Sequence, residues 1–489
     1  MRRAAIHTAL LTGTAALVIG GALSAQQAAT QTQAVVLKGK APVSNEVLQV
    51  KLPRPVEADL AFGAHLILLE DHRTPQITFS IAIPGAGGYY DAADAIGVAT
   101  ATASLMREGT TSRTTAQISE ALETMAANVN VGAGLSGTEA TVAGSSLTEH
   151  FPATLAVAAD VLLHPTFPED ELGRYKQRQK TSILQQRTSA GFLGAELYQR
   201  LVFGTHPAAR VSATAEQVDR LTRDRLVAFH KAHYTPERAL IAMSGDITLA
   251  EAKRALESAL KEWPRGGAAA AAVTDPAAMG PAHVSFIARP GSVQTTLMVG
   301  TQAISRTDPD YDAFQVMNKV LGGGPTGRLF THLREEKGYT YGASSGLTAG
   351  RWKGDWLAQM DVRTEVTEPA MRDLMAEIAR MRDEVMSAKD LDNAKRSLIA
   401  TFALGLESPA AVLGNYLTIY WYKLAPDYWD KYPSRVNAVT GARAQEIAKK
   451  YLDPSRLQIV AVGDPKVADV FKAYGPVDLY DATGAPVKK

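Results

Sequence analysis

Hydrophobic residues follow two kinds of spacing along this chain. Short apolar runs, which are typical of β-strands, occur at 66–69, 77–83, 240–243 and 459–462. Apolar positions spaced by three and four, which indicate helices, occur at 115–126, at 155–163 and from 170 into the 180s. Each half of the chain therefore contains strands, then helices, then a late strand. That order predicts an α+β fold rather than a doubly wound parallel sheet.

Motifs in the first half recur in the second at a nearly constant offset. The segment from Pro236-Glu-Arg238 to Gly245-Asp246 has a counterpart that runs from Pro454-Ser-Arg456 to Gly463-Asp464. A further pair of motifs, which begin at Gly109 and Gly324, recurs at nearly the same offset. Nearly equal offsets over several motifs indicate an internal duplication of roughly 220 residues.

A change in composition marks the boundary between the two copies. Residues 264–281 are rich in Ala, Gly and Pro and lack apolar periodicity, which predicts an exposed linker. The sequence therefore predicts a first domain at 48–263 and a second domain at 282–480.

The N-terminal residues have the features of an export signal. Two arginines precede an apolar stretch, and the small residues Ser24 and Ala25 follow it. This arrangement predicts a secretory signal peptide at 1–25, followed by an N-terminal extension at 26–47. A membrane anchor is the alternative, but the apolar stretch is shorter than the roughly 20 residues that span a bilayer. We therefore expect a periplasmic protein with no transmembrane segment after signal removal.

Composition narrows the possible chemistry. The chain has 489 residues, of which 46% are hydrophobic and 21% charged, as in ordinary globular proteins. It has no Cys, which excludes thiol nucleophiles and Cys-ligated zinc, so a metal would need His and carboxylate ligands. The 51 basic and 50 acidic residues give a net charge of +1, which argues against nucleic acid as the main partner.

Short motifs for metals and nucleotides are weak or missing. Neither His-Glu-x-x-His nor the inverted His-x-x-Glu-His occurs. His230-Lys-Ala-His233 has a usable spacing but no nearby base, so a packing role is favoured. The loop Gly322-Gly323-Gly324-Pro-Thr-Gly-Arg lacks the Gly-Lys-Ser/Thr ending of a phosphate-binding loop. We interpret it as a loop between two helical pieces, or one that borders a peptide channel.

A more informative segment runs from Leu333 to Tyr341. Gly338 should end a helix that carries Arg334, and the residues after Gly338 should begin a strand. A helix end and a strand start this close can direct the Arg334 guanidinium and the Tyr341 phenol to one point. Both groups donate hydrogen bonds, so together they suit a peptide carbonyl oxygen that gains negative charge. The plain alternative is a surface arginine and a core tyrosine.

The order and spacing of these motifs resemble the pitrilysin/insulinase family, the inverted zincins that include the mitochondrial processing peptidase. The likeness extends from about Leu48 to Asp464 and includes Phe167-Pro-Glu-Asp-Glu-Leu172 and Tyr234-Thr-Pro236. The resemblance implies duplicated α+β halves, each a mostly antiparallel sheet packed with helices. It also implies that two such pairs face each other, in one long chain or as two subunits.

The resemblance also shows a departure. Active members carry Gly-Ile/Leu-Ala-His-x-x-Glu-His, whereas this chain reads Gly97-Val-Ala-Thr100-Ala-Thr-Ala103-Ser104. Thr100, Ala103 and Ser104 stand where two zinc ligands and the catalytic base are expected, and the third ligand aligns with Ser182. These side chains cannot replace two imidazoles and two carboxylates, so we expect no bound zinc and no peptide cleavage by this chain alone.

The second half retains the residues that, by resemblance, hold substrate. Arg334 and Tyr341 match the family's catalytic pair, which acts across the interface on the partner's zinc site. The positions assigned to substrate binding are Gly322, Gly323, Gly324 and Asn130.

The resulting hypothesis is the non-zinc subunit of a periplasmic two-chain metallopeptidase, with zinc held by a His-x-x-Glu-His homologue and peptides as substrates. Two alternatives remain: a catalytically inert peptide-binding or scaffold subunit of the same fold, and a hydrolase with an unrecognised site of its own.

Overall fold

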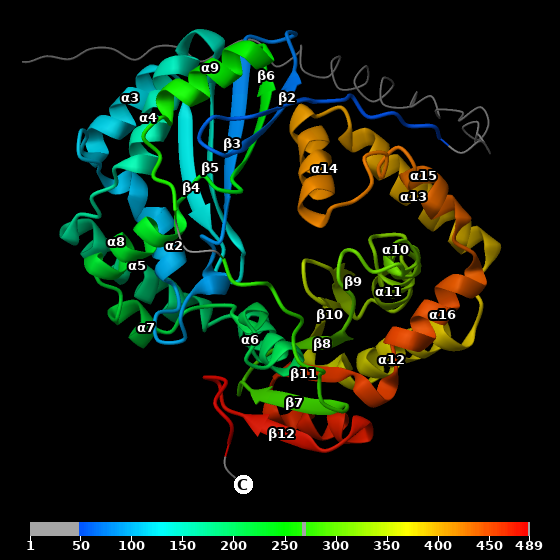
Figure 1. Ribbon diagram of the computed structural model, residues 1–489. Helices are drawn as coiled ribbons and strands as arrows, with labels where there is room; N and C mark the ends of the chain where they lie inside the picture. The colour runs from blue at the N-terminus through cyan, green and yellow to red at the C-terminus, as the bar shows by residue number, and fades with distance from the viewer. Residues whose placement is uncertain (1–47, 267–269, 488–489) are drawn as a thin grey trace, which may run out of the picture. The chain divides into compact units, whose positions relative to one another are not determined.

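The computed structural model describes residues 48–266 and 270–487, which form two six-stranded sheets with helices packed against them (Figure 1). The predicted α+β class is confirmed. The predicted signal peptide at 1–25 and the extension at 26–47 lie outside the described residues.

The first sheet has the strand order β1-β2-β6-β3-β5-β4. Its strands are β1 Val56–Asp59, β2 His65–Glu70, β3 Gln76–Pro84, β4 Asn128–Ala133, β5 Glu139–Leu147 and β6 Leu240–Gly245. Only β2 and β6 pair in parallel; the other neighbours are antiparallel. All six residues of β6 are buried, which explains its continuous apolar run. The edge strand β4 instead alternates exposed positions with buried or half-buried ones.

The second sheet repeats this arrangement as β12-β7-β11-β8-β10-β9. Its strands are β7 His283–Ala288, β8 Gln294–Gln302, β9 Thr340–Thr348, β10 Asp355–Arg363, β11 Gln458–Gly463 and β12 Val477–Tyr480. The starts of β2, β3 and β6 precede those of β7, β8 and β11 by the same offset in each case. The predicted duplication is therefore confirmed. Both sheets are mostly antiparallel, and the second has two parallel pairs, β7 with β11 and β7 with β12.

Helices cover the sheets in both halves. The first half contains α2 Val98–Leu105, α3 Thr115–Thr124, α4 Phe151–Leu163, α5 Glu169–Gln186, α6 Ala190–Phe203, α7 Ala215–Asp219, α8 Arg223–His233 and α9 Leu249–Ala259. The second contains α10 Tyr311–Leu321, α11 Arg328–Phe330, α12 Thr367–Asp383, α13 Ala388–Gly405, α14 Pro409–Tyr422, α15 Tyr432–Ala438 and α16 Gly441–Tyr451. Thr114 and Thr248 begin α3 and α9 with capping boxes, which satisfy backbone N–H groups at each start.

Each half of the chain contributes one helix that packs against the sheet of the other half. Helix α6 packs against β8 and β11 of the second sheet, where its fully buried Tyr198 donates a hydrogen bond to the Trp356 carbonyl (3.0 Å). Its counterpart α14 packs against β2 and β6 of the first sheet through Val412, Leu413 and Tyr416. Each sheet therefore completes its core with a helix from the other half of the chain.

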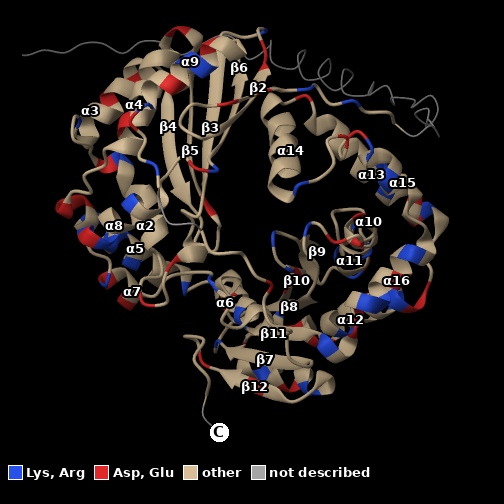
Figure 2. Cartoon of the chain, viewed as in Figure 1, with Lys and Arg blue, Asp and Glu red and all other residues tan. Residues whose placement is uncertain are grey.

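Charged residues lie mainly on helices and loops, while the strands contain few of them (Figure 2). Within the described residues, no single helix is both long and apolar enough to cross a bilayer. Taken together, α13 and α14 have the length and composition to cross a bilayer, but the chain bends by 111° between the two helices.

Candidate functional site

Arg334 lies on a short π-helix, η5 (Thr331–Glu336), that continues from α11. Its widened turn is closed by a hydrogen bond from the Lys337 N–H to the His332 carbonyl, five residues back (3.1 Å). Gly338 ends the helix with a φ of 62°, a left-handed conformation that glycine adopts without strain. The predicted helix end and strand start are confirmed, since β9 begins at Thr340.

The structure brings Arg334 and Tyr341 together. The Cζ atom of Arg334 lies 5.4 Å from the centre of the Tyr341 ring and 4.7 Å from that of Phe330. Tyr341 is 90% exposed, so its phenol points to solvent rather than into the core. A half-buried guanidinium beside an exposed phenol allows both groups to donate hydrogen bonds to a single acceptor. This arrangement contradicts the plain alternative of a core tyrosine.

The π-helix is held from beneath by a buried carboxylate. The imidazole of His332, two residues before Arg334, lies 3.0 Å from Oε1 of Glu377 on α12. Glu377 is 5% exposed, and its Oε2 has no hydrogen-bond partner. This contact ties the segment that carries Arg334 to α12.

The three glycines before the π-helix play different parts. Gly322 is packed against β9: its carbonyl accepts a hydrogen bond from the Ser345 N–H (2.9 Å), and a Cβ atom would lie 2.5 Å from that nitrogen. Gly323 borders a cavity, and its carbonyl accepts a hydrogen bond from the Lys319 ammonium (2.7 Å). Gly324 has a φ of 134°. Thus Gly322 fixes the loop to the sheet, whereas Gly323 is packed against α10, where a Cβ atom would lie 2.7 Å from the Lys319 Cα.

Helix α2, which carries the residues that the resemblance aligns with the metal motif, begins at a buried carboxylate. Asp91 accepts hydrogen bonds from the backbone N–H groups of Gly97 (2.6 Å) and Ala99 (3.0 Å). Burial raises the pKa of Asp91 to about 6, although these hydrogen bonds oppose the shift. The carboxylate fixes the start of α2 and hence the directions of the side chains that follow.

The residues aligned with the zinc ligands gather around Tyr175. Thr100 and Ser182 line one cavity of about 180 Å³ together with Tyr175. Ser104 hydrogen-bonds with the Tyr175 hydroxyl, whose pKa burial raises to about 12. Ala103 is buried. Three hydroxyls and a methyl group do not fit a zinc ion, which takes imidazole, thiolate or carboxylate ligands. Within the described residues, no three His, Asp or Glu side chains form a group that could hold a metal.

Asn130 lies apart from the arginine–tyrosine pair. It is on the edge strand β4, where its Oδ1 accepts a hydrogen bond from Arg107 (3.1 Å). In the described part of the chain, no hydrogen bond or ring contact joins Asn130, Thr100 or Ser104 to Arg334 and Tyr341. The candidate site thus has two parts, one in each half.

The two histidines with metal-like spacing have packing roles instead. The His230 Nε2 lies 2.8 Å from the Leu162 carbonyl, and the His233 ring stacks on Phe229 at 4.3 Å. Burial lowers the pKa of both histidines.

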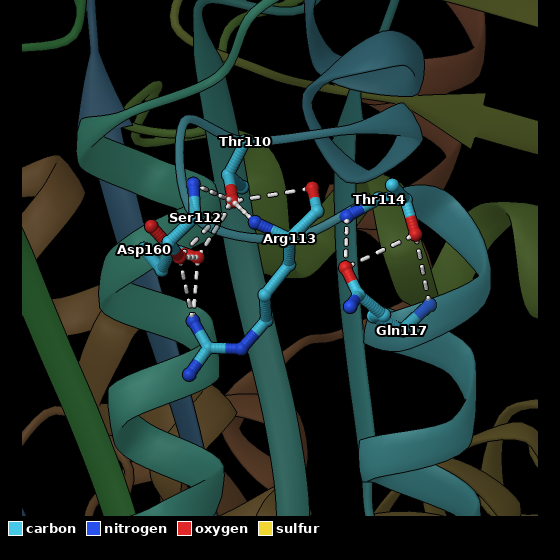
Figure 3. Close-up of polar contacts among 6 residues, drawn as sticks. All are labelled: Thr110, Ser112, Arg113, Thr114, Gln117 and Asp160. Carbon is cyan, nitrogen blue, oxygen red and sulfur yellow. Dashed lines mark hydrogen bonds and ion pairs between the residues drawn. The ribbon is translucent and has the colours of Figure 1, made fainter.

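Sequence reasoning misses a buried carboxylate beneath the loop that follows α2. Asp160 of α4 is 8% exposed and accepts hydrogen bonds from Thr110 (2.7 Å), Ser112 (2.6 Å) and Arg113 (2.6 Å), as Figure 3 shows. Burial raises the pKa of Asp160, but these three donors outweigh burial and hold the pKa below its ordinary value of 3.8. The sequence feature that could have indicated this buried site is that Asp160 is the lone acidic residue in an otherwise apolar helix.

Replacing Asp160 with Asn should destabilise the first half. The change removes a charge that three donors share, so we expect a loss of about 2–4 kcal/mol in the free energy of unfolding by urea at pH 7. Because the folded pKa is depressed, Asp160 contributes stability above its unfolded pKa, and that contribution is lost as the pH falls through the folded value. The difference in unfolding free energy between the parent and Asp160→Asn should therefore shrink below about pH 4.

Asp94→Asn, at an exposed ion pair with Arg225, is the control and should cost less than about 1 kcal/mol. Equal losses would contradict the role given to Asp160.

Two family models match this chain. The model of the insulinase family (peptidase family M16) matches residues 66–202, and that of the peptidase M16 inactive domain matches residues 220–398. Together with the duplicated fold, these matches show that the chain belongs to the insulinase, or M16, peptidase family.

Relatives agree with this assignment. An uncharacterized zinc protease of Rickettsia bellii is 25% identical over 325 residues, which cover 64% of this chain and 76% of the relative. One from Bacillus subtilis is 22% identical over 396 residues, 79% of this chain and 93% of the relative. The crystal structure of a peptidase M16 inactive domain from Pseudomonas fluorescens superposes with a TM-score of 0.77 at 28% identity, covering 84% of this chain and 98% of that one.

Proposed function

We propose that this chain is the non-zinc subunit of a periplasmic two-chain metallopeptidase. Arg334 and Tyr341 would hold and polarise the substrate carbonyl, and a His-x-x-Glu-His homologue would supply the zinc. The observation that carries the proposal is the contact between the half-buried Arg334 guanidinium and the exposed Tyr341 ring, 5.4 Å from guanidinium carbon to ring centre.

The chemistry of the two positions supports this division. The Tyr341 hydroxyl and the Arg334 N–H groups can donate hydrogen bonds to a carbonyl oxygen, and these bonds strengthen as that oxygen gains negative charge. The hydroxyl and methyl groups at Thr100, Ser104, Ser182 and Ala103 offer no group that suits a zinc ligand or a general base. Among the residues compared, the chain thus has donors for the carbonyl, whereas these four positions hold no group that activates water.

The test is peptide cleavage by this chain mixed with its zinc-bearing partner. Because one oxyanion donor contributes about 10²–10³ in kcat, Arg334→Ala and Tyr341→Phe should each lower kcat by roughly that factor. Arg372→Ala, at an exposed arginine of α12, should leave the rate unchanged. If both site variants cleave like the parent, the pair has no part in the reaction, and an inert scaffold subunit becomes the better account.

A further inference from the structure

A second cavity lies behind the glycine-rich loop. It has a volume of about 470 Å³ and is bordered by α10, the loop, β9, α13, α14 and the start of α15. Its apolar lining residues are Leu347, Leu398, Phe402, Trp429 and Tyr432. The rings of Trp429 and Tyr432 lie 5.4 and 4.9 Å from that of Phe402, so the wall is largely aromatic.

Most polar side chains of this cavity already have partners. Asn318 accepts hydrogen bonds from Ser345 (2.7 Å) and Trp356 (2.8 Å), and its amide nitrogen donates to the Ser345 carbonyl. The Lys319 ammonium donates to Gly323. Gln315 donates to the Tyr311 hydroxyl (2.8 Å). With these groups engaged, an apolar ligand group gains most from entering, because it buries carbon against carbon without unpairing a donor.

The cavity and the candidate active surface lie along the same strand, β9. Strand β9 begins beside the arginine–tyrosine pair and reaches the cavity at Gly346 and Leu347. Leu347 lies six positions after Tyr341, which is about 20 Å along a strand. Gly323, at the same cavity, belongs to the loop that connects α10 to the helix carrying Arg334. An extended peptide with a carbonyl at Tyr341 would therefore span this distance with about six residues.

We propose that this cavity is a specificity pocket for an aromatic or large aliphatic side chain of the peptide substrate. That side chain lies about six residues from the bond that is cleaved. The inference rests on the proposed function, since it takes Tyr341 as the point where the carbonyl is held.

The test uses Thr401→Trp on α13. Thr401 is an exposed residue of the cavity rim, so a tryptophan there fills the opening without disturbing the core. Leu404→Trp is the matched control, because Leu404 is 69% exposed on the same helix and does not line the cavity. The probe is a fluorescein-labelled unstructured 12-residue peptide with one Phe, compared by anisotropy with the same peptide carrying Ser instead.

The full-length parent should bind the Phe peptide about 10-fold or more tightly than the Ser peptide. This preference should persist in Leu404→Trp and in Arg334→Ala but disappear in Thr401→Trp. With the partner present, Thr401→Trp should raise KM and leave kcat unchanged. No preference in the parent, or an unchanged preference in Thr401→Trp, overturns the pocket. Failure of the proposed function is separate, because it would appear as unchanged cleavage by Arg334→Ala.

Discussion

Replacing Gly300 with Ala should strongly destabilise the second half. Gly300 is in β8, where a Cβ atom would lie 2.5 Å from the Trp356 carbonyl oxygen, 2.7 Å from Cζ of Tyr198 and closer still to the Tyr198 hydroxyl. Tyr198 is fully buried and hydrogen-bonded to that same carbonyl, so it has no space to retreat. The substitution must displace α6 from the sheet. We expect a loss of about 3 kcal/mol or more in the free energy of unfolding by urea.

The control for this prediction is another strand glycine, Gly132, where a Cβ atom would have room. A Cβ atom at Gly132, in β4, would meet no atom within 4 Å, so Gly132→Ala should change stability by less than about 1 kcal/mol. Tyr198→Leu should partly restore the Gly300→Ala variant, because it removes the ring that collides. If Gly300→Ala is as stable as the parent, then α6 does not pack on β8 as described.

The contrast between local and long-range structure explains what the sequence could predict. The strand at 77–83 and the helix at 115–126 were predictable because their patterns depend on neighbouring residues, and they correspond to β3 and α3. The packing of α6 and α14 on the sheet of the other half was not predictable. A helix pattern shows that an apolar face exists but not which sheet covers it. Only the repeat offset linked the two helices, because α6 begins at Ala190 and α14 begins at the matching position Pro409.

The candidate site shows the same contrast. Arg334 and Tyr341 are seven residues apart, so a helix end and a strand start are enough to bring them together. Ser345 is distant from Gly322 along the chain, and its hydrogen bond to the Gly322 carbonyl depends on the path of the whole β9–β10 hairpin. Sequence spacing gave no account of that contact, which packs Gly322 against the sheet. The role of Gly322 in substrate binding, which the resemblance implies, stays a prediction.

Introducing metal ligands on α2 and α5 should create a zinc site. Thr100 and Ser104 are four residues apart on α2, which places them on one face of the helix. Thr100 shares a cavity with Ser182 of α5, and Ser104 hydrogen-bonds with Tyr175 of that cavity. The variant Thr100→His, Ser104→His, Ser182→Glu would therefore bring two imidazoles and a carboxylate together. Since one outer-shell change alters metal affinity by about 10–100-fold, three new ligands should raise zinc affinity by about 100-fold or more.

The measurement is isothermal titration with zinc at neutral pH, where carboxylates are ionised and most imidazoles are neutral. The register control carries Thr181→Glu in place of Ser182→Glu, because one residue along α5 turns the carboxylate about 100° around the helix axis. That control should bind zinc at least about 10-fold more weakly than the designed variant. A control that binds more tightly would show that the third ligand position is at Thr181. A folded variant with no gain in affinity would show that the three positions do not converge, and the proposed loss of a zinc site at Thr100, Ser104 and Ser182 would then have no structural basis.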